Sequence, residues 1–275
     1  MKPHIHVINL GSMPYQEAWR YQEALQQALI ARKRGTQTAQ TDNLHQNDAP
    51  GDPHSGSSPT PSIPTRSPST RSSDPSAQPD GYLLFVEHPH VYTIGKSGDW
   101  NNLLFTGDIL RQKGIEVVKT DRGGDITYHG PGQLVGYPVL DLERFNLGVA
   151  GYIEALEEVI MRTAAHFGIT AQRIEGRTGV WVKNNKLCAI GIKCSRYVCM
   201  HGFALNVRTD LDYYNGIIPC GINDGGVTSF EKLLNEPVSL KRIKSVLIPL
   251  FLKQFNATAG SSIPSETSQS NQADN

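Results

Sequence analysis

The fold of this chain is decided by residues 179–207, which read GVWVKNNKLCAIGIKCSRYVCMHGFALNV. Apolar and β-branched residues recur there in short runs bounded by polar residues, which is typical of strands. Strands that follow one another with few helices between them indicate the α+β class rather than a doubly wound parallel sheet. The predicted strands are Gly179–Val182, Lys186–Cys194, Tyr197–His201 and Phe203–Val207, with a hairpin turn at Asn184-Asn185.

Further strands and helices are expected outside this stretch. A helix should open at Pro14 and run to about Arg34, where Gly35 fits a stop. Apolar residues at helical spacing predict a second long helix from about Val149 to Phe167. The remaining predicted elements are strands at 4–10, 82–87, 91–95, 115–119 and 134–142, and helices at 108–113, 228–235 and 239–254.

Two segments differ from the rest of the chain in composition. Residues from about 36 to 80 are rich in Ser, Thr, Pro, Asp, Asn and Gln and almost lack large apolar side chains. Such a segment cannot bury enough surface to offset its ordering entropy, so we expect a disordered insertion. Residues 257–275 are polar in the same way. The sequence therefore predicts one domain over 1–256, interrupted at 36–80 and followed by a disordered tail.

Charge and composition disfavour several kinds of partner. The 275 residues include 26 Lys and Arg and 26 Asp and Glu, so the formal net charge is zero. Nucleic acids and anionic membranes are therefore disfavoured as main partners. No signal-peptide pattern opens the sequence, and no run reaches the ~18 apolar residues that span a bilayer. We expect a cytoplasmic protein in which the four cysteines are reduced thiols.

Cys220 is the candidate nucleophile, in the sequence Pro219-Cys220-Gly221. Proline restricts the backbone before the thiol, and glycine permits close approach of another group after it. A nearby helix start would favour the thiolate. The alternative is a structural cysteine in a turn, because free cysteines usually behave as small buried hydrophobes.

Lys186 is the second candidate, at the start of the apolar run Leu187–Ile192. A lysine at the end of a strand normally points to solvent. If it faces Cys220 instead, its ammonium would stabilise the thiolate and lower the pKa of the thiol. It could also exchange protons with the attacking or leaving group.

A glycine-rich segment, Arg122–Gln133, supplies polar groups that could hold a ligand. It contains four glycines and the side chains of Thr127, Tyr128 and His129. Its pattern matches neither the phosphate-binding loop of nucleotide hydrolases nor the dinucleotide fingerprint. A glycine-rich hairpin with a purely structural role is the alternative. His201 follows Cys194 and Cys199 with a spacing that fits no structural zinc site, so no metal is expected.

Taken together, five ordered segments resemble one family closely, the lipoyl(octanoyl) transferases. The resemblance covers about Gly81 to Glu231 and, more loosely, the N-terminal strand and helix. The insertion at about 36–80 is longer than the family pattern leads us to expect. The segments are Arg122–Gln133, Gly176–Trp181, Lys186–Lys193, His201–Asn206 and Pro219–Gly221.

The resemblance implies a mixed or antiparallel sheet packed with helices, like the catalytic domains of biotin protein ligases and lipoate ligases. It implies transfer of an octanoyl or lipoyl group from acyl carrier protein to a lysine of a lipoyl domain of a 2-oxoacid dehydrogenase complex, or of the glycine-cleavage H protein. The chemistry of thioester exchange requires no metal, nucleotide or redox cofactor, and we expect the protein to work as a monomer. Two rival functions stay open: an ATP-dependent lipoate or biotin ligase on the same fold, and a binding module that docks lipoyl domains or carrier proteins without catalysis.

The resemblance also assigns site residues. Cys220 is implied as the acyl-thioester nucleophile and Lys186 as the residue that lowers its pKa. Leu187 and Ile190 are expected to help line an acyl tunnel. The implied substrate-binding residues are Arg122, Gly123, Gly124, Asp125, Ile126, Thr127, Tyr128, His129, Ala189, Ile190, Gly191, Gly202, Phe203 and Ala204.

Overall fold

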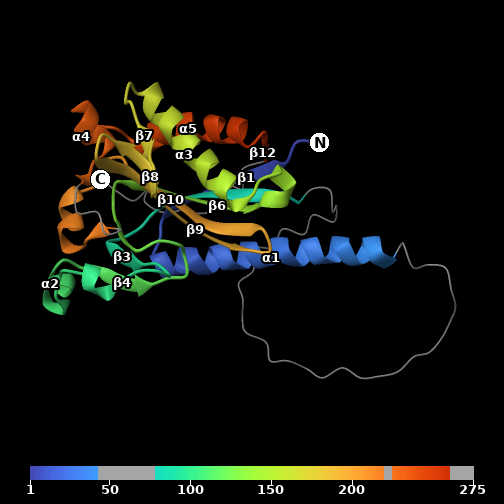
Figure 1. Ribbon diagram of the computed structural model, residues 1–275, viewed down its shortest axis with the longest axis horizontal. Helices are drawn as coiled ribbons and strands as arrows, with labels where there is room; N and C mark the ends of the chain where they lie inside the picture. The colour runs from blue at the N-terminus through green and yellow to red at the C-terminus, as the bar shows by residue number, and fades with distance from the viewer. Residues whose placement is uncertain (43–77, 220–224, 261–275) are drawn as a thin grey trace, which may run out of the picture. The chain divides into compact units, whose positions relative to one another are not determined.

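The computed structural model of the chain describes residues 1–42, 78–219 and 225–260 (Figure 1). The chain divides into two compact units, one formed by residues 1–30 with 79–275 and the other by residues 31–78. All elements discussed below except the end of the first helix belong to the larger unit. Cys220, the predicted nucleophile, lies outside the described residues.

The larger unit is built on a mixed nine-stranded sheet, counted over the described residues. The strand order is β12-β1-β2-β6-β10-β9-β8-β7, and β11 pairs with β9 beside this path. Pairing is parallel in β12-β1-β2 and β11-β9 and antiparallel elsewhere, which confirms the α+β prediction. The strands are β1 His4–Ser12, β2 Gly81–Glu87, β6 Gln133–Asp141, β7 Gln172–Ile174, β8 Arg177–Val182, β9 Asn185–Ser195, β10 Val198–Asn206, β11 Gly226–Val227 and β12 Thr258–Ala259.

A smaller sheet of three strands forms a second layer of the same unit. Its order is β4-β3-β5, with β3 parallel to β4 and antiparallel to β5. Its apolar side chains pack with those of a short helical segment into a separate core that includes Tyr92, Ile126 and Tyr128. The elements of this layer are β3 Val91–Ile94, β4 Glu116–Lys119, β5 Ile126–His129, α2 Gly107–Gln112 and the 3-10 turns η2 Trp100–Asn102 and η4 Leu211–Gly216.

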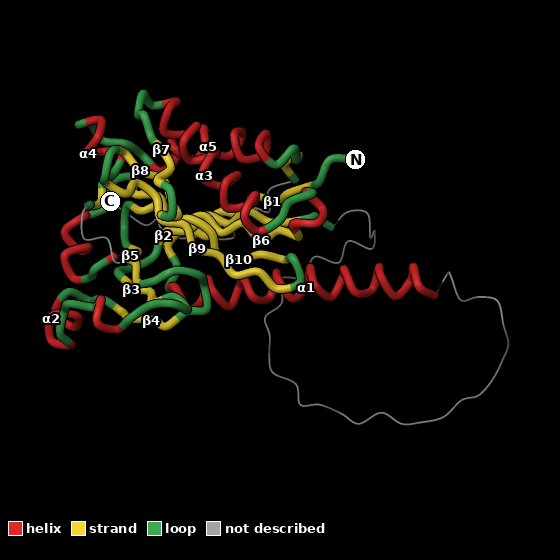
Figure 2. The backbone as a smooth tube through the Cα atoms, in the orientation of Figure 1, coloured by secondary structure: helices red, strands yellow, loops and turns green. Residues whose placement is uncertain are grey.

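Helices cover both faces of the large sheet, as Figures 1 and 2 show. Helices α3 (Val149–His166) and α5 (Leu240–Gln254) pack on one face, where Leu156, Ile160 and Phe251 join the largest core cluster. The first turns of α1 (Tyr15–Asp42) cover the other face through Tyr15, Ala18, Leu29 and Ile30. The remaining elements are α4 Phe230–Leu234 and η3 Leu142–Phe145. Among the described helices, none combines the length and hydrophobicity that crossing a bilayer requires.

The structure differs from the sequence predictions at several boundaries. Helix α1 does not stop at Gly35 but continues to Asp42, because one glycine costs a helix only about 1 kcal/mol and no proline follows at once. Residues 198–206 form one strand rather than two, because β9 pairs with it on both sides of His201. The turn between β8 and β9 lies at Lys183 and Asn184, one residue earlier than predicted. The segment predicted to be a tail begins with β12, which extends the sheet beside β1.

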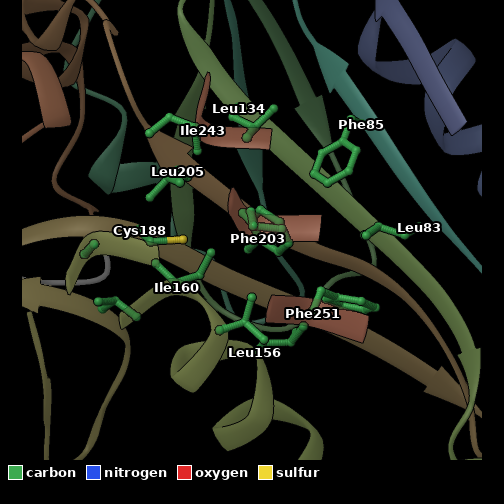
Figure 3. Close-up of a cluster of buried hydrophobic side chains, with 14 of the residues drawn as sticks. Leu83, Phe85, Leu134, Leu156, Ile160, Cys188, Phe203, Leu205, Ile243 and Phe251 are labelled. Atoms are coloured by element: carbon green, nitrogen blue, oxygen red, sulfur yellow. The ribbon is translucent and has the colours of Figure 1, made fainter. Parts of the chain in front are cut away.

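Tight packing of α3 on the sheet is a main source of stability. Leu156 and Ile160 face Cys188 and Phe203 of the sheet, and Phe251 of α5 closes the same cluster (Figure 3). Leu156, Ile160 and Phe251 are fully buried. Removing side-chain volume here would leave a cavity that the rigid sheet cannot fill by relaxing.

We therefore expect Leu156→Ala to lower the free energy of unfolding by about 2–5 kcal/mol, from lost burial and the cavity left behind. Urea unfolding followed by circular dichroism measures the change. Val149→Ala is the control, because Val149 lies in the same helix but is 41% exposed, and its effect should stay within about 0.5 kcal/mol. Equal losses in the two variants would contradict this account of the core.

Candidate functional site

Most of the site residues predicted from the sequence line one cavity of about 480 Å³. It lies between strands β8, β9 and β10 of the large sheet and the loop before β5 of the small sheet. Twelve of the fourteen predicted substrate-binding residues line it, and Lys186 lines it as well. The twelve are Arg122, Gly123, Gly124, Asp125, Thr127, His129, Ala189, Ile190, Gly191, Gly202, Phe203 and Ala204.

The two predicted residues that do not line the cavity, Ile126 and Tyr128, belong to the same strand as two that do. Side chains of a strand point alternately to opposite faces. Thr127 and His129 of β5 therefore face the cavity, while Ile126 and Tyr128 are buried in the core of the small sheet. Ile126 and Tyr128 therefore support the fold of the small sheet and do not line the cavity, although they belong to the same strand as Thr127 and His129.

Two further predicted segments meet as partners in neighbouring strands. Gly191 of β9 lies opposite Gly202 of β10, and Ala189 lies opposite Ala204. Ile190 and Phe203 are also partners, and both supply apolar walls. Antiparallel pairing thus brings residues 189–191 and 202–204 into one wall of the cavity.

The loop Arg122–Asp125 closes the cavity against β9. The backbone N–H of Gly123 donates to the carbonyl oxygen of Ile192 at 2.8 Å. A Cβ atom at Gly191 would lie 2.8 Å from the carbonyl oxygen of Gly123 and 3.3 Å from the Arg122 side chain. Glycine is therefore required at 191 for the loop to approach the strand this closely.

Arg122 is tied inward by its own hydrogen bonds. Its guanidinium donates to the backbone oxygen of Thr93 at 2.6 Å and to the Thr93 hydroxyl at 2.9 Å. A third bond runs to the carbonyl oxygen of Gly123 at 3.1 Å. With only 7% of its surface exposed, Arg122 fixes the shape of the loop and places positive charge behind it.

A buried chain of hydrogen bonds connects this loop region to β10. The Nδ1–H of His129 donates to the Gln133 side-chain oxygen at 2.8 Å, a tautomer inferred from the Gln133 amide donating to Asn206 at 3.0 Å. Asn206 in turn donates to the carbonyl oxygen of Thr228 at 3.1 Å. Burial, aided by nearby His88 and Arg122, holds the pKa of His129 well below its ordinary value, so the ring is neutral at neutral pH.

Lys186 reaches the cavity because of an irregularity in β9. Val180 of β8 pairs with Cys188, but the next residue, Trp181, pairs with Lys186, so Leu187 is an extra residue. Such a bulge re-aims the side chain beside it. Leu187 itself packs in the core and does not line the cavity, whereas Ile190 does.

The side chain of Lys186 is 6% exposed and lies over an aromatic ring. Its Nζ atom is 4.7 Å from the centre of the Trp181 ring. The carbonyl oxygen of Lys186 accepts a hydrogen bond from the backbone of Thr228 at 3.0 Å, and Val227 pairs with Lys186 in β11. Residues 226–228, which follow the segment containing Cys220, are thereby anchored at the lysine. The predicted contact between Lys186 and Cys220 itself stays a prediction.

His201, at which the sequence predicted no metal site, has an unusual backbone conformation. It has φ of 59°, a conformation that non-glycine residues rarely adopt. Its Nε2–H donates to Asp121 at 2.9 Å, and Lys193 donates to the other oxygen of Asp121 at 2.5 Å. The His201 bond, followed by Lys193, lowers the pKa of Asp121 to about 2. Nδ1 of His201 is buried without a hydrogen-bond partner in the described part of the chain, so only one of the two ring nitrogens is hydrogen-bonded there.

Sequence reasoning did not select several side chains that line the cavity, including Tyr15, Arg177, Trp181 and His201. Arg177 and Trp181 stand in a segment that carried the family resemblance, so that segment was the available signal. No signal in the sequence pointed to Tyr15, because Tyr15 reaches the cavity only through the packing of α1 on the sheet.

The cysteines partly depart from the prediction of reduced thiols. Cys194 and Cys199 are cross-strand partners in β9 and β10 and form a disulfide, so the prediction is wrong for this pair. Cys188 is a free thiol, fully buried in the core. Burial raises its pKa far above the ordinary value, which makes it a poor nucleophile.

Comparisons with known proteins agree on one family. The model of the lipoyl protein ligase A/B catalytic domain matches residues 70–252. An octanoyltransferase of Flavobacterium johnsoniae is 42% identical over 263 residues, covering 94% of this chain and 99% of that protein. An octanoyltransferase of Cytophaga hutchinsonii is 42% identical over 248 residues, covering 88% of each.

Solved structures share the fold at low sequence identity. A lipoate-protein ligase A bound with ATP superposes with a TM-score of 0.57 and 17% identity, over 67% of this chain and 77% of that one. A bipartite lipoate protein ligase from Thermoplasma acidophilum gives a TM-score of 0.55 and 18% identity, over 67% and 75%. These matches support the predicted architecture, a mixed sheet packed with helices.

The wall behind the cavity makes stability depend on pH. His88 packs against Tyr15 and His129, donates from Nδ1 to the Met13 carbonyl and accepts from the Tyr137 hydroxyl. Burial lowers the pKa of His88 to about 4. In the unfolded chain the His88 ring takes up a proton near pH 6.5, whereas in the folded chain it does so only near pH 4. The contribution of His88 to the free energy of unfolding is therefore full above pH 6.5 and is lost as the pH falls toward 4.

We expect the free energy of unfolding to fall by on the order of 3 kcal/mol from this residue between pH 6.5 and 4. His88→Gln should remove that part of the decline, as measured by urea unfolding at several pH values. His166→Gln is the control, because His166 is exposed on α3 and should leave the decline intact. A His88→Gln protein with an unchanged pH dependence would contradict the assignment.

Proposed function

We propose, from the premise that this chain belongs to the lipoyl protein ligase A/B catalytic domain family, that it is an acyltransferase of protein lipoylation. The group transferred is octanoyl, or lipoyl, and the acceptor is a lysine side chain of another protein. The observation that supports this most strongly is the gathering of three sequence segments, 122–129, 189–191 and 202–204, around one cavity that also contains Lys186.

The cavity suits a medium-length acyl chain. Its volume of about 480 Å³ falls within the range of small-molecule sites, about 300–1,000 Å³. Val135, Ile153, Ile190 and Phe203 supply apolar walls. Backbone groups of the glycine-rich loop and the strand glycines line the same space, where N–H groups could bind an oxyanion.

The proposed reaction has two steps. The Cys220 thiolate attacks the thioester carbonyl of the acyl carrier protein, the carrier thiol leaves, and the acyl group is held on the enzyme as a new thioester. The neutral amine of the acceptor lysine then attacks this thioester, an amide forms, and the Cys220 thiol is released. Exchange of one thioester for another is near even, and conversion to the amide is downhill.

Lys186 has two proposed roles in these steps. Its ammonium beside Cys220 would lower the pKa of that thiol and favour the nucleophilic thiolate. It would also exchange protons with the attacking amine and the leaving thiol. The buried position of Lys186 in the cavity wall supports these roles, because charge interactions strengthen where water is excluded.

The proposed donor is octanoyl-acyl carrier protein, and the proposed acceptors are lipoyl domains of 2-oxoacid dehydrogenase complexes and the glycine-cleavage H protein. We further propose a monomeric, cytoplasmic enzyme that needs no cofactor. The proposed catalytic domain starts at residue 1, is interrupted between α1 and β2, and includes β12 at its C-terminal side. The relatives named octanoyltransferase favour this proposal over a ligase that activates a free acid with ATP.

The first experiment follows the acyl group by intact mass. Mixing with octanoyl-acyl carrier protein should add one octanoyl group to the wild type and none to Cys220→Ser, because an alcohol is a far weaker nucleophile than a thiolate. Cys188→Ala is the control and should still gain the mass, because that thiol is buried in the core.

A wild type that never gains the mass would favour the binding module instead. The same preparation incubated with octanoic acid, ATP and a lipoyl domain should form no amide. Brisk amide formation without the carrier protein would overturn the proposal in favour of a ligase.

The second experiment tests Lys186 through thiol reactivity. Lys186→Ala should slow the alkylation of Cys220 by iodoacetamide at pH 7 by about tenfold, as expected for a thiol pKa that rises by about one unit. Lys183→Ala is the control, because Lys183 is exposed in the adjacent turn. An unchanged rate in Lys186→Ala would remove the proposed role.

A further inference from the structure

Lys186 is only 6% exposed and lines the cavity, yet among the described residues its ammonium lacks the partner that such a charge usually has. A buried lysine is normally paired with a carboxylate or with hydrogen-bond acceptors. Among the residues that the structure describes, Nζ of Lys186 makes no hydrogen bond and no ion pair. Its Nζ atom lies 4.7 Å from the centre of the Trp181 ring, and its charge also acts on the buried thiol of Cys188.

We infer that Trp181 is a positioning residue, whose indole face holds the ammonium of Lys186 in the cavity by a cation–π interaction. Trp is the aromatic side chain whose face attracts a cation most strongly, and 4.7 Å lies within the ~6 Å reach of the interaction. The inference rests on the proposed function at one point, the action of Lys186 on Cys220. The position of the ammonium on the ring can be tested without any acyl transfer.

The geometry of the sheet brings the two side chains together. Trp181 of β8 and Lys186 of β9 are register partners, and side chains of partners emerge on the same face. The bulge at Leu187 follows at once, so Lys186 is the last paired residue before β9 shifts. The pair therefore sits where the strand is re-aimed toward the cavity, which both residues line.

Trp181 is itself held rigidly, as a positioning residue must be. It is fully buried, and its Nε1–H donates to the carbonyl oxygen of Arg177 at 3.2 Å. Two residues before Trp181, the backbone N–H of Gly179 donates to the buried carboxylate of Glu157 on α3 at 2.9 Å. The first bond orients the indole, and the second anchors β8 to α3.

The surroundings of Trp181 add a second cation beside Lys186, and a nearby carboxylate is engaged by other groups. Arg177 also lies over the Trp181 ring, at 5.9 Å, so this side of the cavity carries two cations. The nearby acid Glu157 is engaged by Gly179 and by Arg173, whose Nε donates at 2.9 Å. An aromatic face stabilises the ammonium without forming a tight ion pair, which would keep the ammonium from acting on a thiolate.

The first test locates the ammonium by nuclear magnetic resonance. The ε-methylene signal of Lys186, assigned by its absence in Lys186→Arg, should be shifted upfield by the ring current of Trp181. Trp181→Leu should abolish this shift and Trp181→Phe should keep part of it, while Trp100→Phe, at an exposed indole, should leave it unchanged. An unshifted signal in the wild type, or a shift that survives Trp181→Leu, would overturn the inference whether or not the protein transfers acyl groups.

The second test separates charge stabilisation from packing. Fluorinated tryptophans keep the shape of the ring but withdraw electron density from its face, which weakens a cation–π interaction. In a Trp19→Phe, Trp100→Phe protein, Trp181 is the remaining indole. The rate constant for alkylation of Cys220 should fall stepwise with each added fluorine, by about tenfold over the series.

A fluorinated protein that keeps both its fold and its full alkylation rate would overturn the inference, because the charge on the ring face would then be irrelevant. The fluorinated series also keeps the test valid if Trp181→Leu does not fold. Failure of the proposed function has a different signature, since the octanoyl mass would be missing while the upfield signal of Lys186 remained.

Discussion

The pairing of β9 with β10 is the constraint on which the site depends. It sets Gly191 opposite Gly202 and Ile190 opposite Phe203, so two separate segments of the chain form one wall of the cavity. The hydrogen bond from the Gly123 N–H to the Ile192 carbonyl oxygen, with the bonds from Lys193 and His201 to Asp121, then attaches the loop of the small sheet to that wall. A shift of one residue in this register would turn the apolar side chains to the wrong face and remove the glycine that the loop approaches.

The glycine-rich segment serves the architecture as much as the ligand. Arg122 donates its hydrogen bonds to Thr93 and to the loop itself. Ile126 and Tyr128 pack in the core of the small sheet. His129 joins a buried chain of hydrogen bonds that reaches Thr228 through Gln133 and Asn206. Such a fully bonded network holds the loops around the cavity in one arrangement, because breaking any link leaves a buried polar group unsatisfied.

Positive charge is concentrated on one side of the cavity. Arg177 and Lys186 both lie over Trp181, and Arg122 lies behind the loop. In the proposed reaction a thiolate and an oxyanion form in this region, and fixed cations stabilise such charges more strongly where water is excluded. The aromatic face explains how the protein keeps an ammonium there without a described carboxylate beside it.

The sequence by itself determined the fold class, most element boundaries and the segments from which the site is built. Runs of apolar residues, glycines and polar motifs are local signals, and local chemistry sets whether a segment becomes a strand, a turn or a loop. The tertiary structure alone decided which members of each segment face the cavity, as with Thr127 against Ile126, and which distant side chains join them, as with Tyr15 and Trp181. It also decided that β10 continues through His201 and that Cys194 bonds Cys199, because both depend on register with β9. Register and packing are relations between segments, and no single segment encodes them.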